Sequence, residues 1–485
     1  MTAVVTLVAL PLAVALAVFV WPEARRPLAL IGVAGLAAAV LATGLGVVGG
    51  GEVWVAVGGW APPGIPLRVD ALSVLLLGLT LLVAALTTLY AFGYWGRHSA
   101  GDIDRRERAF WPLWWMLWAG LNALFVSGDA FNAYVALELI GLSAVALVAV
   151  AGEATALRAA LRYLLVSLAG SLAYLAGVAL LYGQYGRLDL AGLTAALEAG
   201  PVPALALAVI TAGLLMKTAL FPLPFWLPAA HSQAPGPVSA VLSALVVKAG
   251  FFLLLRFWFG VFGDWETGPG TAVLGTLGGV AVIWGSFQAL AAARLKLLVA
   301  YSTVAQLGYL FLAFPLMAGS GPAAFLGREG ALYLALSHGL AKGAAFLAAG
   351  TCLWSAGTDR LDAIGNVLHR LPVTTTAFAI AGVSLIGLPP TGGFVGKWLL
   401  MRAMAETGAW IWLGVIVAGT FLGAGYIFRV LVTVFRVSEP TPALERRPTR
   451  TMEASALLLA LAALGMGFVA PVVEPLMRGL TGAGS

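Results

Sequence analysis

A small set of titratable side chains lies inside stretches of sequence that are otherwise apolar. Glu138 interrupts AFNAYVALELIGLSAVALVAV, Lys217 lies in TAGLLMKTALFP, and Lys248 lies in VSAVLSALVVKAGFFLLLR. On insertion scales a charge at the centre of a bilayer costs roughly 2.5–3.5 kcal/mol, so such residues are rare and commonly functional. Side chains that gain and lose protons at this depth predict a path for protons. Its candidate members are Glu138, Lys217, Lys248, His338, Lys342, Lys397 and His231.

Glu138 and Lys217 are the candidates with opposite charge. Burial disfavours charge on each group and pairing favours it, so an arriving proton can tip the balance of such a pair. The alternative is a static ion pair that orients two helices. Lys248 has no obvious acidic partner in the sequence, and we interpret it as a proton carrier rather than as a lysine that reaches an interface.

His338 and Lys342 are four residues apart in LALSHGLAKGAAF, so they share one face of a helix. A histidine titrates near physiological pH, which suits a proton relay, although His338 alone is also compatible with a helix-to-helix hydrogen bond. Lys397 follows the helix-breaking stretch GLPPTGG, whose freed backbone groups we expect to hold water near its ammonium. His231 lies in a second such stretch, as a relay or as a cap of the broken helix.

Other polar residues have simpler interpretations. AYSTVAQLGY carries Tyr301, Ser302, Thr303 and Gln306, which either hold a chain of water or join helices by hydrogen bonds. Asp129 precedes an apolar run and is predicted to cap that helix.

The composition requires lipid around most of the chain. Hydrophobic residues make up 61% of 485 and charged residues 10%, whereas a soluble domain carries about 25% charged residues. The single cysteine, Cys352, excludes a disulfide within the chain and a cysteine-based metal cluster, and we expect it to be buried. No glycine-rich phosphate loop follows a predicted strand. The net charge of +6 reflects arginines at helix ends rather than nucleic-acid binding.

About fourteen apolar segments are long enough to span a membrane, and two of them are interrupted by proline. Pro222, Pro224 and Pro228 follow Lys217, and Pro389 and Pro390 precede Lys397. Irregular backbone at membrane depth persists only where it is buried in protein or lines a wet cavity. The predicted spans are 2–20, 27–49, 71–95, 110–127, 129–151, 160–183, 202–220, 236–259, 271–292, 297–318, 329–356, 372–405, 409–433 and 454–475.

The distribution of basic residues predicts the orientation. With the N-terminus outside, the inner loops hold 17 of the 27 Lys and Arg residues, including Arg294 and Lys296, and the outer loops hold 6. This excess follows the positive-inside rule. The two interrupted spans are five spans apart and so run in opposite directions, which suggests an inverted repeat. The predicted divisions are 1–109, a first repeat 110–260, a second repeat 261–435, and a loop with the last helix at 436–485.

Five stretches together resemble the antiporter-like subunits shared by respiratory complex I, membrane-bound hydrogenases and Mrp-type cation/proton antiporters. They are SGDAFNAYVALE, LLMKTALFPLPFWLPAAHSQAPGPVSAVLSALVVKAG, AYSTVAQLGYL, SHGLAKGAAFLAAG and GLPPTGGFVGKW. The resemblance implies an all-α polytopic membrane protein of about fourteen helices, with two inverted five-helix repeats and broken helices 7 and 12. It also implies a proton path through a glutamate on helix 5, lysines on helices 7, 8 and 12, and polar residues on helix 11. The matching positions are Glu138, Lys217, Lys248, Lys397, His338 and Lys342.

Within this family, three features narrow the resemblance: the first favours the D-type subunit of Mrp antiporters, the second argues against M-type subunits, and the third argues against L-type and Mrp A subunits. The segment VAVGGWAPPGIPLRVDALSVLLL resembles the second loop of D-type subunits, Lys397 replaces the glutamate typical of M-type complex I subunits, and the chain ends soon after its last predicted span. The implied function is proton translocation in a multisubunit sodium (or other cation)/proton antiporter. The alternatives are a proton-pumping N-type subunit of complex I or of a hydrogenase, which would make the chain part of an NADH:quinone oxidoreductase, and a scaffold that conducts nothing.

The resemblance further implies the surroundings of the chain. Expected partners are membrane subunits similar to Mrp A, B, C, E, F and G, together with lipid, protons and Na⁺, without nucleic acid. No cofactor or metal is expected, since no ligation of a quinone, flavin or iron–sulfur cluster is visible. The expected location is a bacterial cell (inner) membrane, with the N-terminus outside.

Overall fold

The chain is a multi-pass helical membrane protein. The computed structural model describes residues 2–58, 64–96, 103–263, 265, 268–319, 321–434 and 444–470. Within these residues, eleven helices are long and apolar enough to cross a membrane. Three of the arginines counted above in the loops lie outside the described residues: Arg97 and Arg436 on the predicted inner side and Arg478 on the outer side. Part of the segment VAVGGWAPPGIPLRVD and positions 471–475 of the last predicted span also lie outside them.

The chain divides into two compact units. The first comprises Met1–Leu81, His98–Ala219 and Leu245–Glu266, and the second comprises Leu82–Arg97, Leu220–Ala244 and Thr267–Ser485. The linear divisions predicted from the sequence stay a prediction, because this partition groups segments by packing rather than by repeat.

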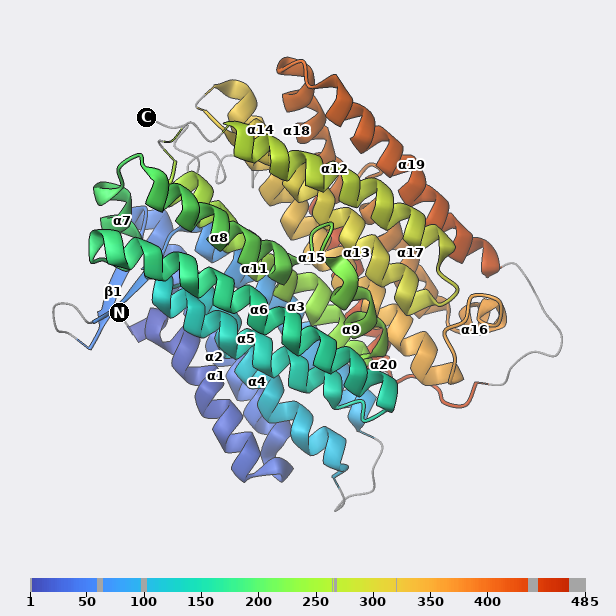
Figure 1. The fold of residues 1–485 in the computed structure, drawn as a ribbon. Coiled ribbons are helices and arrows are strands. Elements are labelled where there is room, and N and C mark those ends of the chain that lie inside the picture. Colours follow the sequence, from blue (N-terminus) through green and yellow to red (C-terminus); the bar gives the residue numbers. More distant parts are fainter. Residues whose placement is uncertain are drawn as a thin grey trace. The chain divides into compact units, whose positions relative to one another are not determined.

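Apolar helices build unit 1, and in Figure 1 α1, α2, α4, α5 and α6 lie side by side. Small residues allow the closest approach: a Cβ on Gly170 of α6 would lie 2.8 Å from the carbonyl oxygen of Gly213 on α8. The elements of unit 1 are α1 (Thr2–Val20), η1 (Pro22–Ala24), α2 (Arg25–Gly50), β1 (Val53–Val57), β2 (Ile65–Val69), the start of α3 (Ala71–Trp95), α4 (Arg105–Phe125), α5 (Ala130–Ala149), α6 (Ala154–Tyr185), α7 (Leu190–Ala196), α8 (Pro201–Thr218), α11 (Val247–Arg256) and the π-helix η4 (Phe257–Val261).

Unit 2 is also built from apolar helices, and Figure 1 shows α12 between α13 and α19. Its elements are the end of α3, η2 (Pro224–Trp226), α9 (Leu227–Gln233), α10 (Gly236–Val241), α12 (Gly268–Ala291), α13 (Leu295–Leu312), α14 (Phe314–Met317), α15 (Pro322–Ala356), α16 (Gly365–Arg370), α17 (Pro372–Ile386), α18 (Gly392–Glu406), α19 (Trp410–Thr433) and α20 (Arg450–Gly465). The π-helix η3 (Leu242–Val246) joins α10 to α11.

Both predicted breaks are present. α8 ends at Thr218, and the next helical turn begins at Pro224. α17 ends at Ile386, and Thr391 caps α18 by accepting a hydrogen bond from the backbone of Phe394. The prediction that Asp129 caps a helix is also confirmed, since its carboxylate accepts hydrogen bonds from Phe131 N and Asn132 N, each at 2.8 Å.

The predicted number of fourteen spans and the inverted repeat stay predictions. Segments 110–127, 372–405 and 454–475 correspond to α4, to α17 with α18, and to α20, none of which is among the eleven candidate spans. The helices α17, α18 and α20 have 15, 15 and 16 residues, shorter than a typical span. The sequence analysis also missed the antiparallel hairpin formed by β1 and β2.

Candidate functional site

Glu138 and Lys217 meet within unit 1, as predicted. Glu138 lies in the middle of α5, and Lys217 lies in the last turn of α8, where the negative end of the helix dipole favours a cation. The Lys217 Nζ is 3.7 Å from Glu138 Oε1, which is an ion pair but longer than a hydrogen bond. It donates hydrogen bonds to Ser167 Oγ at 3.0 Å and to Leu137 O at 3.5 Å. The ammonium therefore has two neutral acceptors besides the carboxylate.

A small cavity adjoins this pair. Its volume is about 10 Å³, and Lys217 and Ser167 contribute its polar lining. A space of this size holds about one water molecule. It is also lined by Val246, Ala249 and Gly250, which lie on either side of Lys248 in the chain.

Lys248 is 1% exposed on α11, directly after the π-helix η3. The neighbouring Gly250 permits close contact between α11 and α8, because a Cβ there would lie 2.7 Å from Thr218 Cγ2. A π-helical turn widens a helix locally and is common at functional sites. No pattern in the sequence predicts this π-helical turn.

In unit 2, Lys342 is fully buried on α15 and contacts α13. Its Nζ donates a hydrogen bond to Val299 O at 2.9 Å and another to Ser302 Oγ. His338, one turn earlier, is 2% exposed. His338 and Lys342 thus lie on one helix, as predicted, and both side chains are buried.

Lys397 bridges the break between α17 and α18. Its Nζ donates hydrogen bonds to Ile386 O at 2.9 Å, Leu385 O at 3.4 Å and Thr420 Oγ1 at 3.3 Å, and it lies 4.1 Å from the ring centre of Tyr309. The last carbonyls of a helix have no partner within the helix. The ammonium therefore binds two of the freed carbonyls directly, and the expectation that groups at this break hold water beside it stays a prediction.

Side chains from α13 and α19 connect Lys342 to Lys397. Ser302 accepts from Lys342, and Tyr426 of α19 interacts with both Ser302 and Gln306. Gln306 Nε2 donates to Leu385 O at 2.8 Å, the same carbonyl that Lys397 contacts. Of the residues predicted to form a water chain, Ser302 and Gln306 thus belong to one polar connection.

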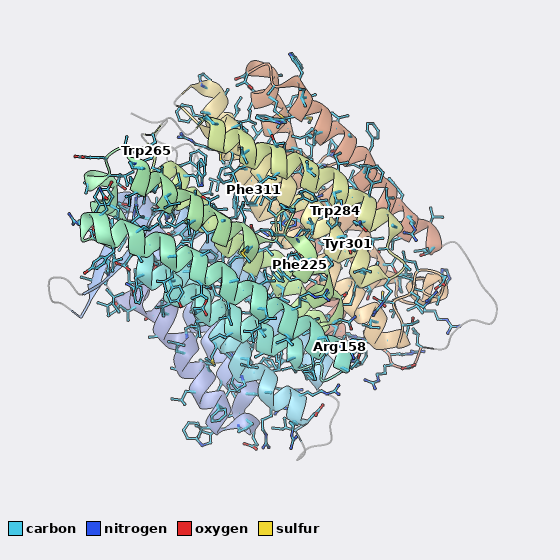
Figure 2. The ribbon with its side chains drawn as sticks, in the orientation of Figure 1. Arg158, Phe225, Trp265, Trp284, Tyr301 and Phe311 are labelled. Atoms are coloured by element: carbon cyan, nitrogen blue, oxygen red, sulfur yellow. The ribbon has the colours of Figure 1, made fainter. Side chains whose placement is uncertain are left out.

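Tyr301 does not join this connection. Figure 2 shows it beside Trp284, and their ring centres are 5.9 Å apart in an edge-to-face contact between α13 and α12. Thr303 shares a hydrogen bond of 2.8 Å with Ser243, which joins two helices. These two residues pack helices rather than line the connection.

His231 is completely buried in α9, between the rings of Trp226 and Phe346 at 6.3 and 5.6 Å. Neither ring nitrogen forms a hydrogen bond of normal geometry with a described residue, although the imidazole interacts with the backbone of Leu227. Its electrostatic neighbours include Lys342 and Lys296. The backbone oxygen of His231, rather than its ring, accepts a bond from Ser239 Oγ at 2.7 Å.

The position of Lys296 differs from the prediction. The distribution of basic residues predicts an inner loop for Lys296, but its side chain is 1% exposed in the first turn of α13. Four of the five lysines of the chain are therefore buried, and the side chain of the fifth, Lys217, is only 8% exposed. Arg294, two residues earlier, made this stretch look like a loop, and no pattern in the sequence reveals that the Lys296 side chain is buried.

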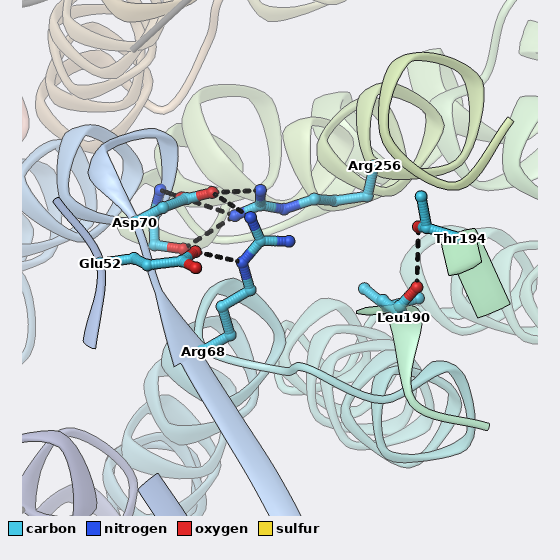
Figure 3. Close-up of polar contacts among 7 residues, drawn as sticks. Glu52, Arg68, Asp70, Leu190, Thr194 and Arg256 are labelled. Carbon is cyan, nitrogen blue, oxygen red and sulfur yellow. Dashed lines mark hydrogen bonds and ion pairs between the residues drawn. The ribbon is translucent and has the colours of Figure 1, made fainter. Parts of the chain in front are cut away.

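A second group of charges that the sequence analysis missed lies beside the β-hairpin of unit 1 (Figure 3). Arg256 contacts both carboxylate oxygens of Asp70 and donates to Ser73 Oγ at 3.1 Å. Arg68 pairs with Glu52 at 2.9 Å and lies 3.8 Å from Asp70. Burial raises the pKa of the Asp70 carboxyl, but the hydrogen bonds and charge of Arg256 outweigh burial and hold this pKa at about 2, below its usual 3.8.

We expect Asp70→Asn to destabilise unit 1. Because the folded-state pKa of Asp70 is depressed, its stabilisation is present above pH 4 and is lost as the pH falls toward 2, and the shift corresponds to about 2 kcal/mol. Thermal unfolding in detergent should show a lower Tm for Asp70→Asn at pH 7, with the difference from the unmodified protein shrinking toward pH 2. Glu52→Gln, which alters a pair exposed by 42% on the carboxylate side, is the control and should leave the Tm unchanged. Equal Tm values for Asp70→Asn and the unmodified protein at pH 7 would contradict this account.

Together, the fold and these groups define a membrane protein with titratable side chains at membrane depth. A family model described as NADH:quinone oxidoreductase/Mrp antiporter, TM matches residues 127–423, more than half of the chain. The chain belongs to this family, and the predicted membership is confirmed.

Two curated relatives illustrate the match. The chain is 38% identical to the N-type subunit of the NADH-quinone oxidoreductase of Desulforudis audaxviator over 434 residues, which cover 86% of this chain and 84% of the relative. It is 30% identical to the D-type subunit of a Na⁺/H⁺ antiporter of Bacillus subtilis over 430 residues, 87% of this chain and 84% of the relative.

Solved structures of membrane complexes contain chains with the same fold. A chain of the Mrp complex from Dietzia sp. superposes with a TM-score of 0.87 at 26% identity, covering 99% of this chain and 96% of that chain. A chain of respiratory complex I from Thermus thermophilus gives a TM-score of 0.75 at 28% identity, with 98% of both chains covered.

Proposed function

We propose that the chain is the proton-translocating subunit of a multisubunit membrane complex that exchanges protons for sodium or another cation. The observation that carries this proposal is the low exposure of all five lysines, one of them beside Glu138, in a chain with so few charged residues. Packing alone does not require such groups, and each is costly in a bilayer. A scaffold that conducts nothing would not need these buried lysines.

The proposed path starts at the Glu138–Lys217 pair. A proton that reaches Glu138 cancels its negative charge, and Lys217 then keeps only the neutral acceptors Ser167 and Leu137. Removing the carboxylate's attraction makes the ammonium a better proton donor. Lys217 can then release its proton to a water molecule in the adjoining cavity, toward Lys248.

The remaining steps of the proposal lie in unit 2. The face of His338 and Lys342 receives the proton, and the hydroxyl groups of Ser302 and Tyr426 pass it on. Gln306 and the Leu385 carbonyl position Lys397 to receive it. His231 is a further relay in this scheme. The Lys397 ammonium then releases a proton and becomes a neutral amine, and the next proton restores the ammonium that binds the carbonyls at the end of α17.

The surroundings proposed for the chain follow from its relatives. Partners would be membrane subunits similar to Mrp A, B, C, E, F and G, and the location would be a bacterial inner membrane with the N-terminus outside. The predicted repeats 110–260 and 261–435 with broken helices 7 and 12 belong to this proposal. The sodium site is assigned to no residue of this chain.

A redox-driven complex is the second candidate. It is favoured by the 38% identity to an N-type subunit of NADH-quinone oxidoreductase, compared with 30% to a D-type subunit of an antiporter. The same path would then be driven by a partner's chemistry.

Mass spectrometry of the subunits that co-purify with this chain in mild detergent separates the two candidates. We expect small hydrophobic membrane subunits, and sodium-gradient-driven proton movement when the complex is placed in vesicles. Co-purified flavin or iron–sulfur subunits, with no sodium-driven proton movement, would overturn the antiporter proposal and assign the chain to a redox enzyme.

A further inference from the structure

Lys296 is a buried lysine that the proposed path does not use. It occupies the first turn of α13, where the positive end of the helix dipole disfavours a cation. Its Nζ donates a hydrogen bond to Ala234 O, in the turn between α9 and α10. That carbonyl also accepts from Ser239 Oγ at 3.2 Å, so it does not need the lysine to be satisfied. Lys296 therefore lies at a costly end of the helix, and its bond to Ala234 O adds to one that this carbonyl already accepts.

The neighbours of Lys296 suggest a role in proton transfer. His231 lies one turn before Ala234, and both Lys296 and Lys342 interact electrostatically with its imidazole. The ring is fully buried, and neither nitrogen has a hydrogen bond of normal geometry with a described residue. An imidazole near two lysines can accept a proton from one and pass it to the other through its two nitrogens.

Arg294, just before the first turn of α13, reaches the protein surface. Arg294 has a side chain exposed by 38% and donates to Asp359 Oδ1 at 2.7 Å, while Asp359 is exposed by 2%. The other carboxylate oxygen of Asp359 accepts from the backbone N of Lys296 at 3.2 Å. Titratable groups thus follow one another from the surface inward: Arg294 with Asp359, then Lys296, His231 and Lys342.

We propose that Lys296 is a proton-carrying residue that joins the surface pair Arg294–Asp359 to His231. This inference rests on the proposed function of proton translocation. The Lys296 ammonium gives a proton to the imidazole of His231, which becomes an imidazolium, and the neutral amine is recharged by a proton that arrives from the Asp359 end. Unit 2 then exchanges protons with the surface as well as with unit 1, and turnover of the complex requires both connections.

The test is proton flux through the assembled complex in vesicles, with Lys296 replaced. Lys296→Gln keeps a donor for Ala234 O but cannot carry a proton, and we expect it to lower flux by roughly 100-fold. Lys296→His restores a titratable group that works at lower pH, so flux should recover and the pH profile should shift to the acid side. A merely structural lysine would not produce this shift.

Asp362→Asn is the matched control, because Asp362 forms an exposed pair with Arg360 three residues along the chain from Asp359. It should leave flux unchanged, whereas Asp359→Asn should lower it. Normal flux in Lys296→Gln, in a complex whose flux is abolished by Lys217→Met, would overturn this inference and leave the proposed function intact. If neither Lys296→Gln nor Lys217→Met changes the flux, the proposed function itself is wrong.

Discussion

Lys217→Met is expected to lower proton flux through the assembled complex by at least about 100-fold, the scale on which a positioned proton-transfer group contributes. The reason is geometric: this ammonium lies 3.7 Å from Glu138, and Lys217 lines the cavity that the neighbours of Lys248 also line. Methionine fills a similar volume but can neither hold nor release a proton. Flux is measured as sodium-driven acidification of vesicles, after mass spectrometry has shown that all subunits remain assembled.

Glu138→Gln completes this experiment. It removes the charge that holds Lys217 and should reduce flux strongly, and the double substitution should be no worse than Lys217→Met alone, because both residues act in one step. Ser167→Ala is the graded control, since it removes only the hydrogen bond of 3.0 Å to Lys217 and should have a smaller effect. Unchanged flux in both Lys217→Met and Glu138→Gln would show that the pair is a static contact between α5 and α8.

The space around this pair is narrow enough to constrain the mechanism. A Cβ on Gly141 would lie 2.7 Å from Ser167 Oγ and 3.5 Å from Lys217 Nζ, so the glycine keeps these two groups in contact. The cavity of about 10 Å³ has room for one water rather than for a hydrated sodium ion. One water molecule at this position would suffice to accept a proton from Lys217.

Much of the fold could be predicted because lipid imposes simple rules. A continuous apolar run must be helical at membrane depth, since every backbone group needs a partner there. Proline removes a backbone donor, so the breaks after Lys217 and before Lys397 could be placed within a few residues. The hairpin of β1 and β2 escaped prediction because it lies between spans, where these rules do not apply.

The candidate site was only partly predictable for a different reason. Sequence position fixes which helix carries a lysine, and it sufficed for the pairing of Glu138 with Lys217. It does not fix what the end of the side chain contacts, which depends on neighbouring helices. The sequence therefore did not predict which carbonyls bind Lys397, nor that Lys296 is buried although it lies two residues after Arg294.

Lys342→Met is expected to stop transfer within unit 2 and to lower flux by at least about 100-fold. Lys342 is fully buried, and its route onward leads through Ser302 to Tyr426, Gln306 and the carbonyl shared with Lys397. Lys342→Met removes the ammonium that donates a proton to Ser302. Ser302→Ala removes only the first acceptor and should lower the flux less. Flux is followed in the same vesicle assay, at several pH values.

Cys352→Ala is the control on the same helix, because Cys352 is also buried, at 1% exposure, but carries no charge in the proposed path. It should assemble and conduct normally, which would show that changing a buried residue of α15 does not by itself stop flux. Lys342→Arg separates charge from proton release, since an arginine stays protonated. If Lys342→Arg conducts like the unmodified protein, Lys342 supplies a fixed positive charge and the relay must bypass it.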